Sequence, residues 1–201
     1  MSVLSFLDLS SYAGLAATGL FTLNILLGTL LGIAYKKHRY WVKLPQSIKQ
    51  INIYKLHNCT AYIALLLMLI HPIFLLFDPK TTFKFIDIVF PLNAPHQKLF
   101  VALGTLSMFA IFTLVITSQK VVKNRMSFRT WKNIHLISYF VAPLFILHGI
   151  VMDPQLLDRP LDLLDAEKIL SELCLVILVA AGIFRYRYHL TNQQSKTKKS
   201  L

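Results

Sequence analysis

Acidic residues are scarce in this sequence. Only nine Asp and Glu accompany 21 Lys and Arg, and charged residues of both signs make up 15% of the 201-residue chain. A soluble domain typically carries about 25% charged residues. So little charge, beside 55% hydrophobic residues, excludes an ordinary water-exposed surface. We therefore expect an integral membrane protein whose solvent is lipid.

Disulfides and nucleotide-binding motifs are also missing. The two cysteines, Cys59 and Cys174, fall in predicted spans near opposite faces of the bilayer, which argues against a disulfide between them. No glycine-rich phosphate fingerprint follows a strand, which excludes a nicotinamide-binding unit of that kind. The N-terminus lacks the positive n-region of a cleaved signal peptide, so we expect it to begin a retained helix.

Long apolar stretches are what the chain has instead. Five of them are long enough to cross a bilayer, at residues 12–35, 54–77, 99–118, 131–152 and 169–188. The stretch 81–96 is too interrupted to cross, and we expect an interfacial loop or half-helix that covers the outer site. We predict an all-α membrane bundle over residues 1–190, followed by a disordered polar tail over residues 191–201.

The basic residues gather on one side of this predicted bundle. Segments 36–55, 119–132 and 185–201 hold 16 of the 21 Lys and Arg and no acidic residue. By the positive-inside rule these segments are cytoplasmic, which places the N-terminus outside and the C-terminus inside a cell (inner) membrane. The rule accounts for the formal net charge of +12 without nucleic acid as a partner and leaves membrane lipid as the surroundings.

Four histidines lie inside two of the predicted spans, where polar side chains are costly. His57 and His135 fall near the cytoplasmic edge, and His71 and His148 lie about 20 Å farther out. Two imidazoles at one depth can fill both axial positions of a haem iron, whereas zinc or copper needs more ligands than each level supplies. We therefore predict two haem b groups, one above the other, and no residues for hydride or acyl chemistry.

The angular positions of the histidines fit this pairing only in part. Fourteen residues bring His71 to within about 40° of His57 around a straight helix, but thirteen residues leave His148 about 140° from His135. Pro143 lies between the second two, and a proline inside a span bends or rewinds the helix. We expect this bend to bring His148 round to the face of His135.

The remaining histidines and the basic residues near the spans have plainer explanations. His38, His96 and His189 lie in loops or at span ends and are expected to be solvated. The positive-inside rule is a sufficient explanation for each basic residue that could contact a haem propionate. Those residues are Lys55, Arg129 and Lys132 on the inside and Lys84 or Lys98 on the outside.

The order and spacing of the four histidines carry a family resemblance. The pattern is His57-x13-His71, a span without histidine, and His135-x12-His148 followed by Gly149. It resembles the ferric reductase-like transmembrane domain shared by ferric reductases, NADPH oxidases and the haem subunit of bacterial methionine sulfoxide reductase systems, and it covers residues 12–188. The resemblance implies a membrane cytochrome b that carries electrons to an outer-face acceptor, with His57 and His135 on the inner haem and His71 and His148 on the outer.

The resemblance also separates this chain from the larger family members. Their last span continues into a cytoplasmic flavin- and nicotinamide-binding domain, whereas this sequence reaches only a short polar tail. We therefore expect the haem-bearing membrane subunit of an oxidoreductase, which receives electrons from a separate flavoprotein reductase or from quinol. Two other classes stay open: a haem-free transporter that uses the histidines as proton or metal relays, and a structural subunit that tolerates their loss.

Overall fold

The computed structural model describes residues 4–33, 35–37, 39–153, 156 and 166–197 of the chain. These residues form helices and loops, and no β-strand occurs among them. The predicted all-α fold is therefore confirmed. The longer helices are α1 (Phe6–Gly32), α4 (Ile53–Phe77), α6 (Lys98–Ser118), α8 (Phe128–Leu136), α9 (Ser138–Val151) and α10 (Ala166–Thr197). The short ones are η1 (Tyr35–Lys37), α2 (Arg39–Val42), α3 (Gln46–Lys49), α5 (Phe85–Val89), η2 (Pro91–Asn93) and α7 (Lys120–Lys123).

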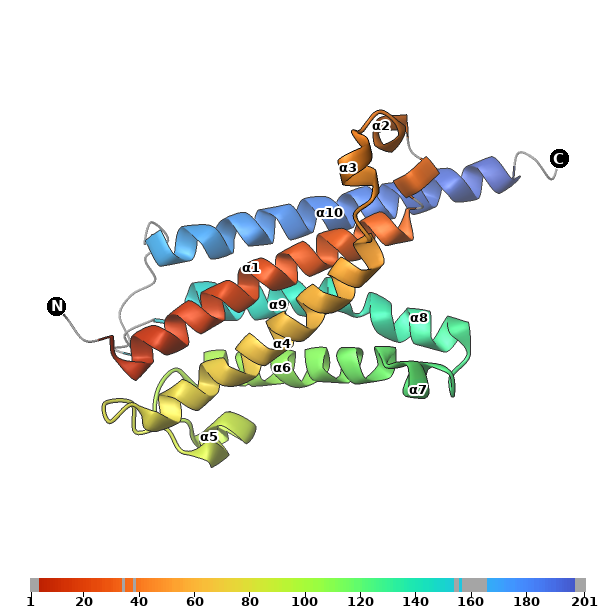
Figure 1. Cartoon of the computed structure of the whole chain (residues 1–201). Coiled ribbons are helices and arrows are strands. Elements are labelled where there is room, and N and C mark those ends of the chain that lie inside the picture. The colour runs from red at the N-terminus through yellow and green to blue at the C-terminus, as the bar shows by residue number, and fades with distance from the viewer. Residues whose placement is uncertain (1–3, 34, 38, 154–155, 157–165, 198–201) are drawn as a thin grey trace.

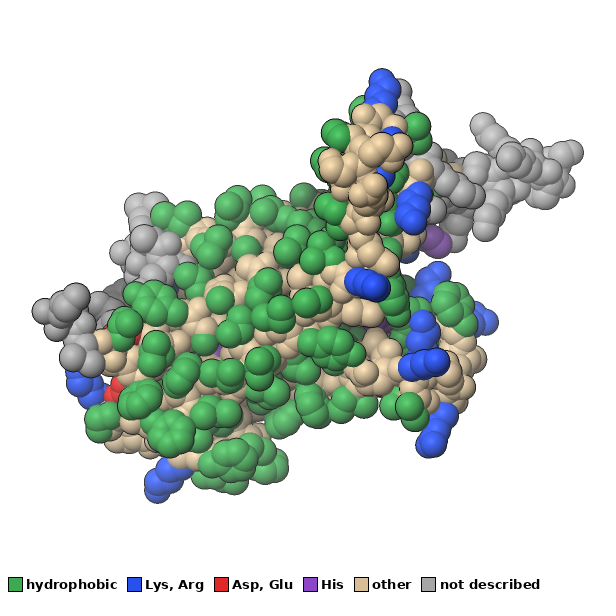
Figure 2. Space-filling model, viewed as in Figure 1, with side chains coloured by type: hydrophobic (Ala, Val, Ile, Leu, Met, Phe, Trp, Pro, Cys, Tyr) green, Lys and Arg blue, Asp and Glu red, His purple; other side chains and the backbone are tan. Residues whose placement is uncertain are grey.

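Five segments in the described part of the chain are long and apolar enough to cross a bilayer. The shortest has 21 residues, which at 1.5 Å per residue matches a hydrocarbon core of about 30 Å. Figure 2 shows apolar side chains covering the middle of the molecule, while Lys and Arg gather at the end that carries α2, α3 and α7. An apolar belt next to a basic end is the surface of a multi-pass membrane protein, as predicted.

The first span begins earlier than the hydrophobic pattern indicated. Ser5 caps α1, because its hydroxyl accepts a hydrogen bond from the Asp8 backbone N–H at 3.1 Å and the Asp8 carboxylate accepts one from the Ser5 N–H at 3.0 Å. Asp78, at the end of α4, accepts a further hydrogen bond from the Leu7 N–H at 2.9 Å. This reciprocal capping box starts the helix at Phe6 instead of near Tyr12 and ties its first turn to the last turn of α4.

Helix α1 lies between α4 and α10 and packs against both (Figure 1). Helix α9 packs against α1, α6 and α10, so it faces α4 across the interior of the bundle. The rings of Phe21 and Phe145 meet edge to face between the two histidine levels, with centroids 6.2 Å apart. The core around them consists of Ala17, Ile25, Ala64, Met68, Ile111, Val141, Ala142, Ile146, Ile150, Cys174 and Leu178. This apolar core fixes the separation between the helices that carry the histidines.

The fourth span is interrupted at a position that the sequence did not indicate. The break lies at Ile137, between α8 and α9, and Pro143 sits inside α9. At the break the Ile137 N–H donates a hydrogen bond to the Ile134 carbonyl at 3.0 Å. The Ser138 hydroxyl donates one to the His135 carbonyl at 2.7 Å. Such i→i−3 bonding rotates the chain by about 120° per residue instead of 100°, so the break reduces the angular mismatch between His135 and His148 by about 20° for each residue involved. A local rewinding is therefore present one to two turns before the proline, at Ile137.

The segment 81–96 forms the half-helix that we expected beside the outer histidines. It contains α5 and η2, and the Thr105 hydroxyl on α6 donates a hydrogen bond to the Ile88 carbonyl at 2.8 Å, which fixes α5 on the bundle. Phe83 packs with Ala94, while Phe85 and Phe90 are exposed. Exposed aromatic rings at the end of a membrane bundle suit the lipid–water interface.

Helix α10 extends beyond both ends of the predicted fifth span. Its apolar part runs over Lys168–Thr191, and the helix continues to Thr197. It thus enters the stretch for which the sequence indicated no regular structure, and residues 198–201 lie outside the described residues.

Candidate functional site

The structure brings the four intramembrane histidines together as two pairs. The ring centroids of His57 and His135 lie 6.1 Å apart, with an angle of 72° between the ring planes. Those of His71 and His148 lie 6.3 Å apart, at 79°. These are the pairs that the depths of the residues predicted. The distance separates the rings too far for a direct hydrogen bond and leaves room for one atom between them.

That separation is compatible with a metal ion held between the two imidazoles. A metal–nitrogen bond of about 2 Å on each side, added to the radius of about 1.2 Å of each five-membered ring, sets the two centroids about 6 Å apart. Among the described residues no group of three or more His, Cys, Asp or Glu side chains could hold a metal ion. Each pair therefore offers two imidazoles and no third protein ligand, which fits the axial positions of haem iron and not a tetrahedral zinc site.

Hydrogen bonds at Nδ1 fix the tautomer of three of the rings. Nδ1 of His57 lies 3.1 Å from the Asn24 carbonyl oxygen, and Nδ1 of His71 lies 2.7 Å from the Ser10 carbonyl oxygen. Nδ1 of His148 lies 2.7 Å from the Phe100 carbonyl oxygen. Because a carbonyl only accepts, each Nδ1 carries the proton and Nε2 keeps the free lone pair that binds a metal.

A glycine four residues after each of these carbonyls lets the ring approach the facing helix. A Cβ at Gly14 would lie 3.0 Å from Nδ1 of His71, and one at Gly28 would lie 3.2 Å from Cε1 of His57. A Cβ at Gly104 would lie 2.7 Å from Cε1 of His148. We call this arrangement of a carbonyl at position i and a glycine at i+4 the glycine clamp. It holds a histidine ring edge-on against a neighbouring helix.

The glycine clamp is repeated along α1 at the spacing of the histidines on α4. Ser10 and Gly14 clamp the outer histidine, and Asn24 and Gly28, fourteen residues later, clamp the inner one. The two helices also bond in the reverse direction, because the Ser10 hydroxyl donates to the His71 carbonyl at 2.8 Å and the Asn24 amide donates to the His57 carbonyl. This repeat was not among the features predicted from the sequence. Its signal is a polar residue followed by a glycine four positions later, which occurs twice in register with His57 and His71.

His135 is held differently from the other three. Its Nδ1 lies 3.3 Å from the Ser118 hydroxyl on α6 and contacts no backbone carbonyl in the described part of the chain. On α6, Ser118 lies fourteen residues after Gly104, so a side chain stands where the clamp pattern would place a glycine. The ring of Trp131 stacks on His135, with centroids 5.1 Å apart and an interplanar angle of 23°.

A cavity of about 500 Å³ opens at the inner histidine pair. Its lining includes His57, His135 and Trp131 together with three cationic side chains, Lys132 as predicted and Lys123 and Arg185 in addition. No acidic residue lines it in the described part of the chain. Lys55 and Arg129, which the sequence also indicated, are not among its lining residues. A roomy cavity with two imidazoles and excess positive charge suits a flat molecule that carries carboxylates.

Arg185 reaches this cavity because α1 has a glycine beside it. A Cβ at Gly32 would lie 2.6 Å from the guanidinium carbon and both terminal nitrogens of Arg185. The guanidinium therefore lies directly against the α1 backbone. The sequence alone ranked Arg185 as an ordinary cytoplasmic charge, since its contact with Gly32 joins residues more than 150 positions apart.

At the outer level the space lies on both sides of the histidine pair. Two cavities of about 90 Å³ each are lined by His71 and His148, one towards the 81–96 segment and the other towards α1 and α10. Phe83 and Ile88 line the first, so that segment covers the outer histidines as predicted. Lys168, which is buried, lines the second, whereas Lys84 and Lys98 line neither.

The remaining histidines lie away from these pairs. His96 is near the ring of Phe83, with centroids 6.3 Å apart, and His189 is exposed on α10. The placement of His38 lies outside the described residues.

Comparison with known protein families matches residues 13–146 to the family described as ferric reductase like transmembrane component. The matched range covers about two thirds of the chain and contains three of the four paired histidines, while His148 lies two residues beyond it. Searches of curated proteins and of solved structures gave no match.

Proposed function

Because the chain belongs to the ferric reductase-like transmembrane family, a family of membrane proteins with redox-related roles, we propose that it is a membrane cytochrome b. Transmembrane domains of this family generally bind haem. In the proposed assignment His57 and His135 hold the inner haem b, and His71 and His148 hold the outer one. The observation that carries the proposal is the pair of centroid separations, 6.1 Å and 6.3 Å, at two depths of one bundle.

The chain's own residues supply the binding and the orientation. The carbonyls of Asn24, Ser10 and Phe100 keep three imidazoles protonated at Nδ1, which leaves Nε2 free to bind iron. A haem held by each pair would supply one-electron transfer. The apolar core between the levels excludes water and separates them by about 20 Å along α4.

We further propose that electrons enter at the basic end of the bundle and leave at the opposite end. The cytoplasmic donor is a separate flavoprotein or quinol, and the acceptor lies at the outer face. The lining of the inner cavity, which has no acidic residue in the described part of the chain, supports a haem at this end, because Lys123, Lys132 and Arg185 can balance its two propionates. Lys168 occupies the corresponding position beside the outer pair.

The decisive experiment is a pyridine haemochrome assay with optical spectra on protein expressed with ample haem supply. We expect about two b-type haems per chain and a low-spin spectrum, as two pairs of imidazole ligands require. Colourless protein would refute the cytochrome assignment and favour the haem-free relay, in which the same histidines pass protons or metal ions.

The proposed orientation predicts a clear difference in thiol labelling. Both native cysteines are free and are first replaced by alanine. In intact cells, a membrane-impermeant maleimide is expected to label a Lys80→Cys variant, on the outer loop, and to leave a Lys43→Cys variant unlabelled until the cells are permeabilised. Both positions are exposed in the structure, so access to the side chain is matched. The opposite labelling pattern would reverse the direction of electron flow.

A further inference from the structure

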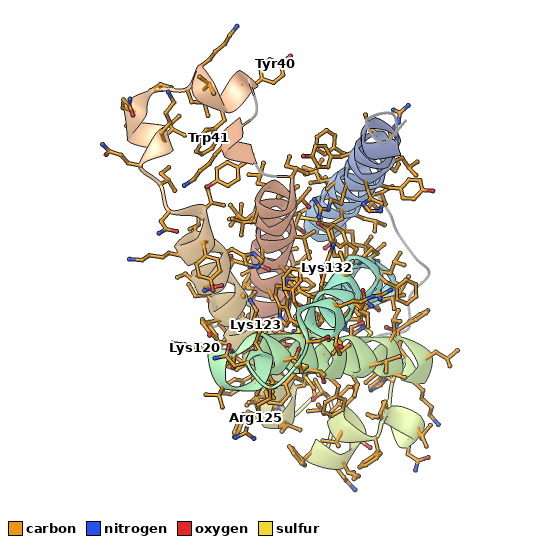
Figure 3. The ribbon with its side chains drawn as sticks, turned by 90° about the vertical axis from the view of Figure 1, so that its right-hand side faces the viewer. Tyr40, Trp41, Lys120, Lys123, Arg125 and Lys132 are labelled. Atoms are coloured by element: carbon orange, nitrogen blue, oxygen red, sulfur yellow. The ribbon has the colours of Figure 1, made fainter. Side chains whose placement is uncertain are left out.

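Trp131 and Lys123 form a column on the inner histidine that lacks the glycine clamp. The Trp131 ring stacks on His135 at 5.1 Å, and Nζ of Lys123 lies 3.9 Å from the centroid of the Trp131 ring. The order is thus ammonium, indole, imidazole, and then the facing ring of His57 at 6.1 Å. Figure 3 looks onto this end of the bundle, where Lys120, Lys123, Arg125 and Lys132 gather around α7 and α8.

A tryptophan and a lysine at a membrane interface have an ordinary explanation, namely an aromatic belt and the positive-inside rule. Two observations do not fit it. A belt tryptophan points its N–H at the wet headgroups, whereas Nε1 of Trp131 is buried and has no hydrogen-bond partner among the described residues. Trp131 and Lys123 also line the inner cavity, so both side chains face the proposed haem site.

His135 depends on this column for support, because in the described part of the chain it lacks the carbonyl acceptor that the other three histidines have. Three histidines have a carbonyl acceptor at Nδ1, which fixes the ring and makes the imidazole a more basic ligand. His135 has only the Ser118 hydroxyl at 3.3 Å, and its ring plane is supported by Trp131. A positive charge at the far side of the same stack favours the reduced state of an iron bound there, because reduction adds a negative charge.

We infer that Lys123 and Trp131 are positioning residues that raise the reduction potential of the inner haem iron through the stack on His135. The inference rests on the proposed function, since it requires iron between His57 and His135. The cation–π contact holds the ammonium group over the indole and away from the headgroups. Raising the inner potential favours entry of an electron from a cytoplasmic donor.

The test is a potentiometric titration of the full-length chain with both haems bound. We expect Lys123→Met to lower the equilibrium constant for reduction of the inner haem roughly tenfold, or about 59 mV for one electron, because a unit charge about 12 Å away acts at an effective dielectric of about 20. Lys123→Gln should give the same shift if the methionine variant folds poorly. The outer haem should keep its potential, and the His71→Ala variant identifies the inner signal.

The matched control is Lys120→Met, which removes an exposed lysine from the same short helix without touching the indole. A charge screened by water and salt should change the equilibrium constant less than twofold. Trp131→Phe keeps an aromatic ring in the stack, so the reduction potential of the inner haem should stay close to the wild-type value. Trp131→Leu removes the ring that holds the Lys123 ammonium group, so it should lower the reduction potential of the inner haem as Lys123→Met does. The double variant Lys123→Met with Trp131→Leu should show no further decrease.

The outcomes separate this inference from the proposed function. Wild-type protein without haem would overturn both. Protein with two haems, in which Lys123→Met shifts the inner potential no more than Lys120→Met, would overturn the inference alone. A fall of the inner potential in Trp131→Leu with none in Lys123→Met would also overturn it, because the effect would then be one of packing.

Discussion

His71→Ala is expected to lose about one haem per chain and to keep a low-spin b-type spectrum from the other. The ring pairs lie at two levels, and among the four paired histidines His71 contacts only its outer partner, His148, with ring centroids 6.3 Å apart. With one axial imidazole removed, the outer haem loses half of its protein ligation, while the clamp of Asn24 and Gly28 on His57 is untouched. The pyridine haemochrome assay measures the stoichiometry directly.

Double variants make this prediction specific to the pairing. His71→Ala with His148→Ala removes both ligands of one level and should lose no more haem than either single variant. His57→Ala with His71→Ala removes one ligand from each level and should lose nearly all haem. His189→Ala, an exposed histidine on α10, is the control and should retain two. Loss of both haems in every single variant would contradict the assignment of ligands by level.

The single variants also discriminate among the classes of function that the sequence left open. A structural subunit tolerates the replacement of all four histidines, and a haem-free relay has no haem stoichiometry to change. Only a cytochrome with two separate haem sites loses one of its two haems in each single variant. The same set of proteins therefore tests the family assignment for this chain, including His148, which lies outside the matched residues.

The sequence was sufficient to predict the features that depend on local pattern. Apolar length defined the spans, and charge defined the two ends, because both properties are read within one segment. The depths of the four histidines followed from their distance to the nearest loop. Even the need for rewinding between His135 and His148 was visible as an angular mismatch, although the sequence indicated Pro143 and not the break at Ile137.

What the sequence could not show are contacts between helices. The support of His148 by Phe100 and Gly104 joins residues that are more than 40 positions apart, and a glycine in an apolar span has no signature of its own. Arg185 and Lys123 looked like any other cytoplasmic charge until packing placed them in the inner cavity. Their roles depend on which face each helix presents to its neighbour, and that is decided by tertiary packing.

The glycine clamp can be tested by adding a single carbon atom. We expect Gly104→Ala to lose most of the outer haem, because the new Cβ would lie 2.7 Å from Cε1, 2.8 Å from Nε2 and 2.9 Å from Nδ1 of His148. The ring has to move away from α6, which breaks its hydrogen bond to the Phe100 carbonyl and changes its position relative to His71. The inner haem should remain at about one per chain.

The other glycines supply a graded series with a matched control. At Gly14 the nearest atom of His71 would lie 3.0 Å from the added Cβ, and at Gly28 the nearest atom of His57 would lie 3.2 Å away. Gly19, on the same helix, has no atom within 4 Å and should keep both haems. We expect haem loss to decrease in the order Gly104→Ala, Gly14→Ala, Gly28→Ala, Gly19→Ala, with Gly28→Ala acting on the inner haem.

Which of the two haems is lost in each glycine variant distinguishes displacement of a histidine ring from a general loss of protein stability. A protein destabilised as a whole would release both haems together and would lose thermal stability in step with haem content. Displacement of one ring removes one haem and leaves the spectrum of the other. If Gly19→Ala proved as damaging as Gly104→Ala, close approach of the histidine rings could not be the reason for these glycines, and small residues would serve only helix packing.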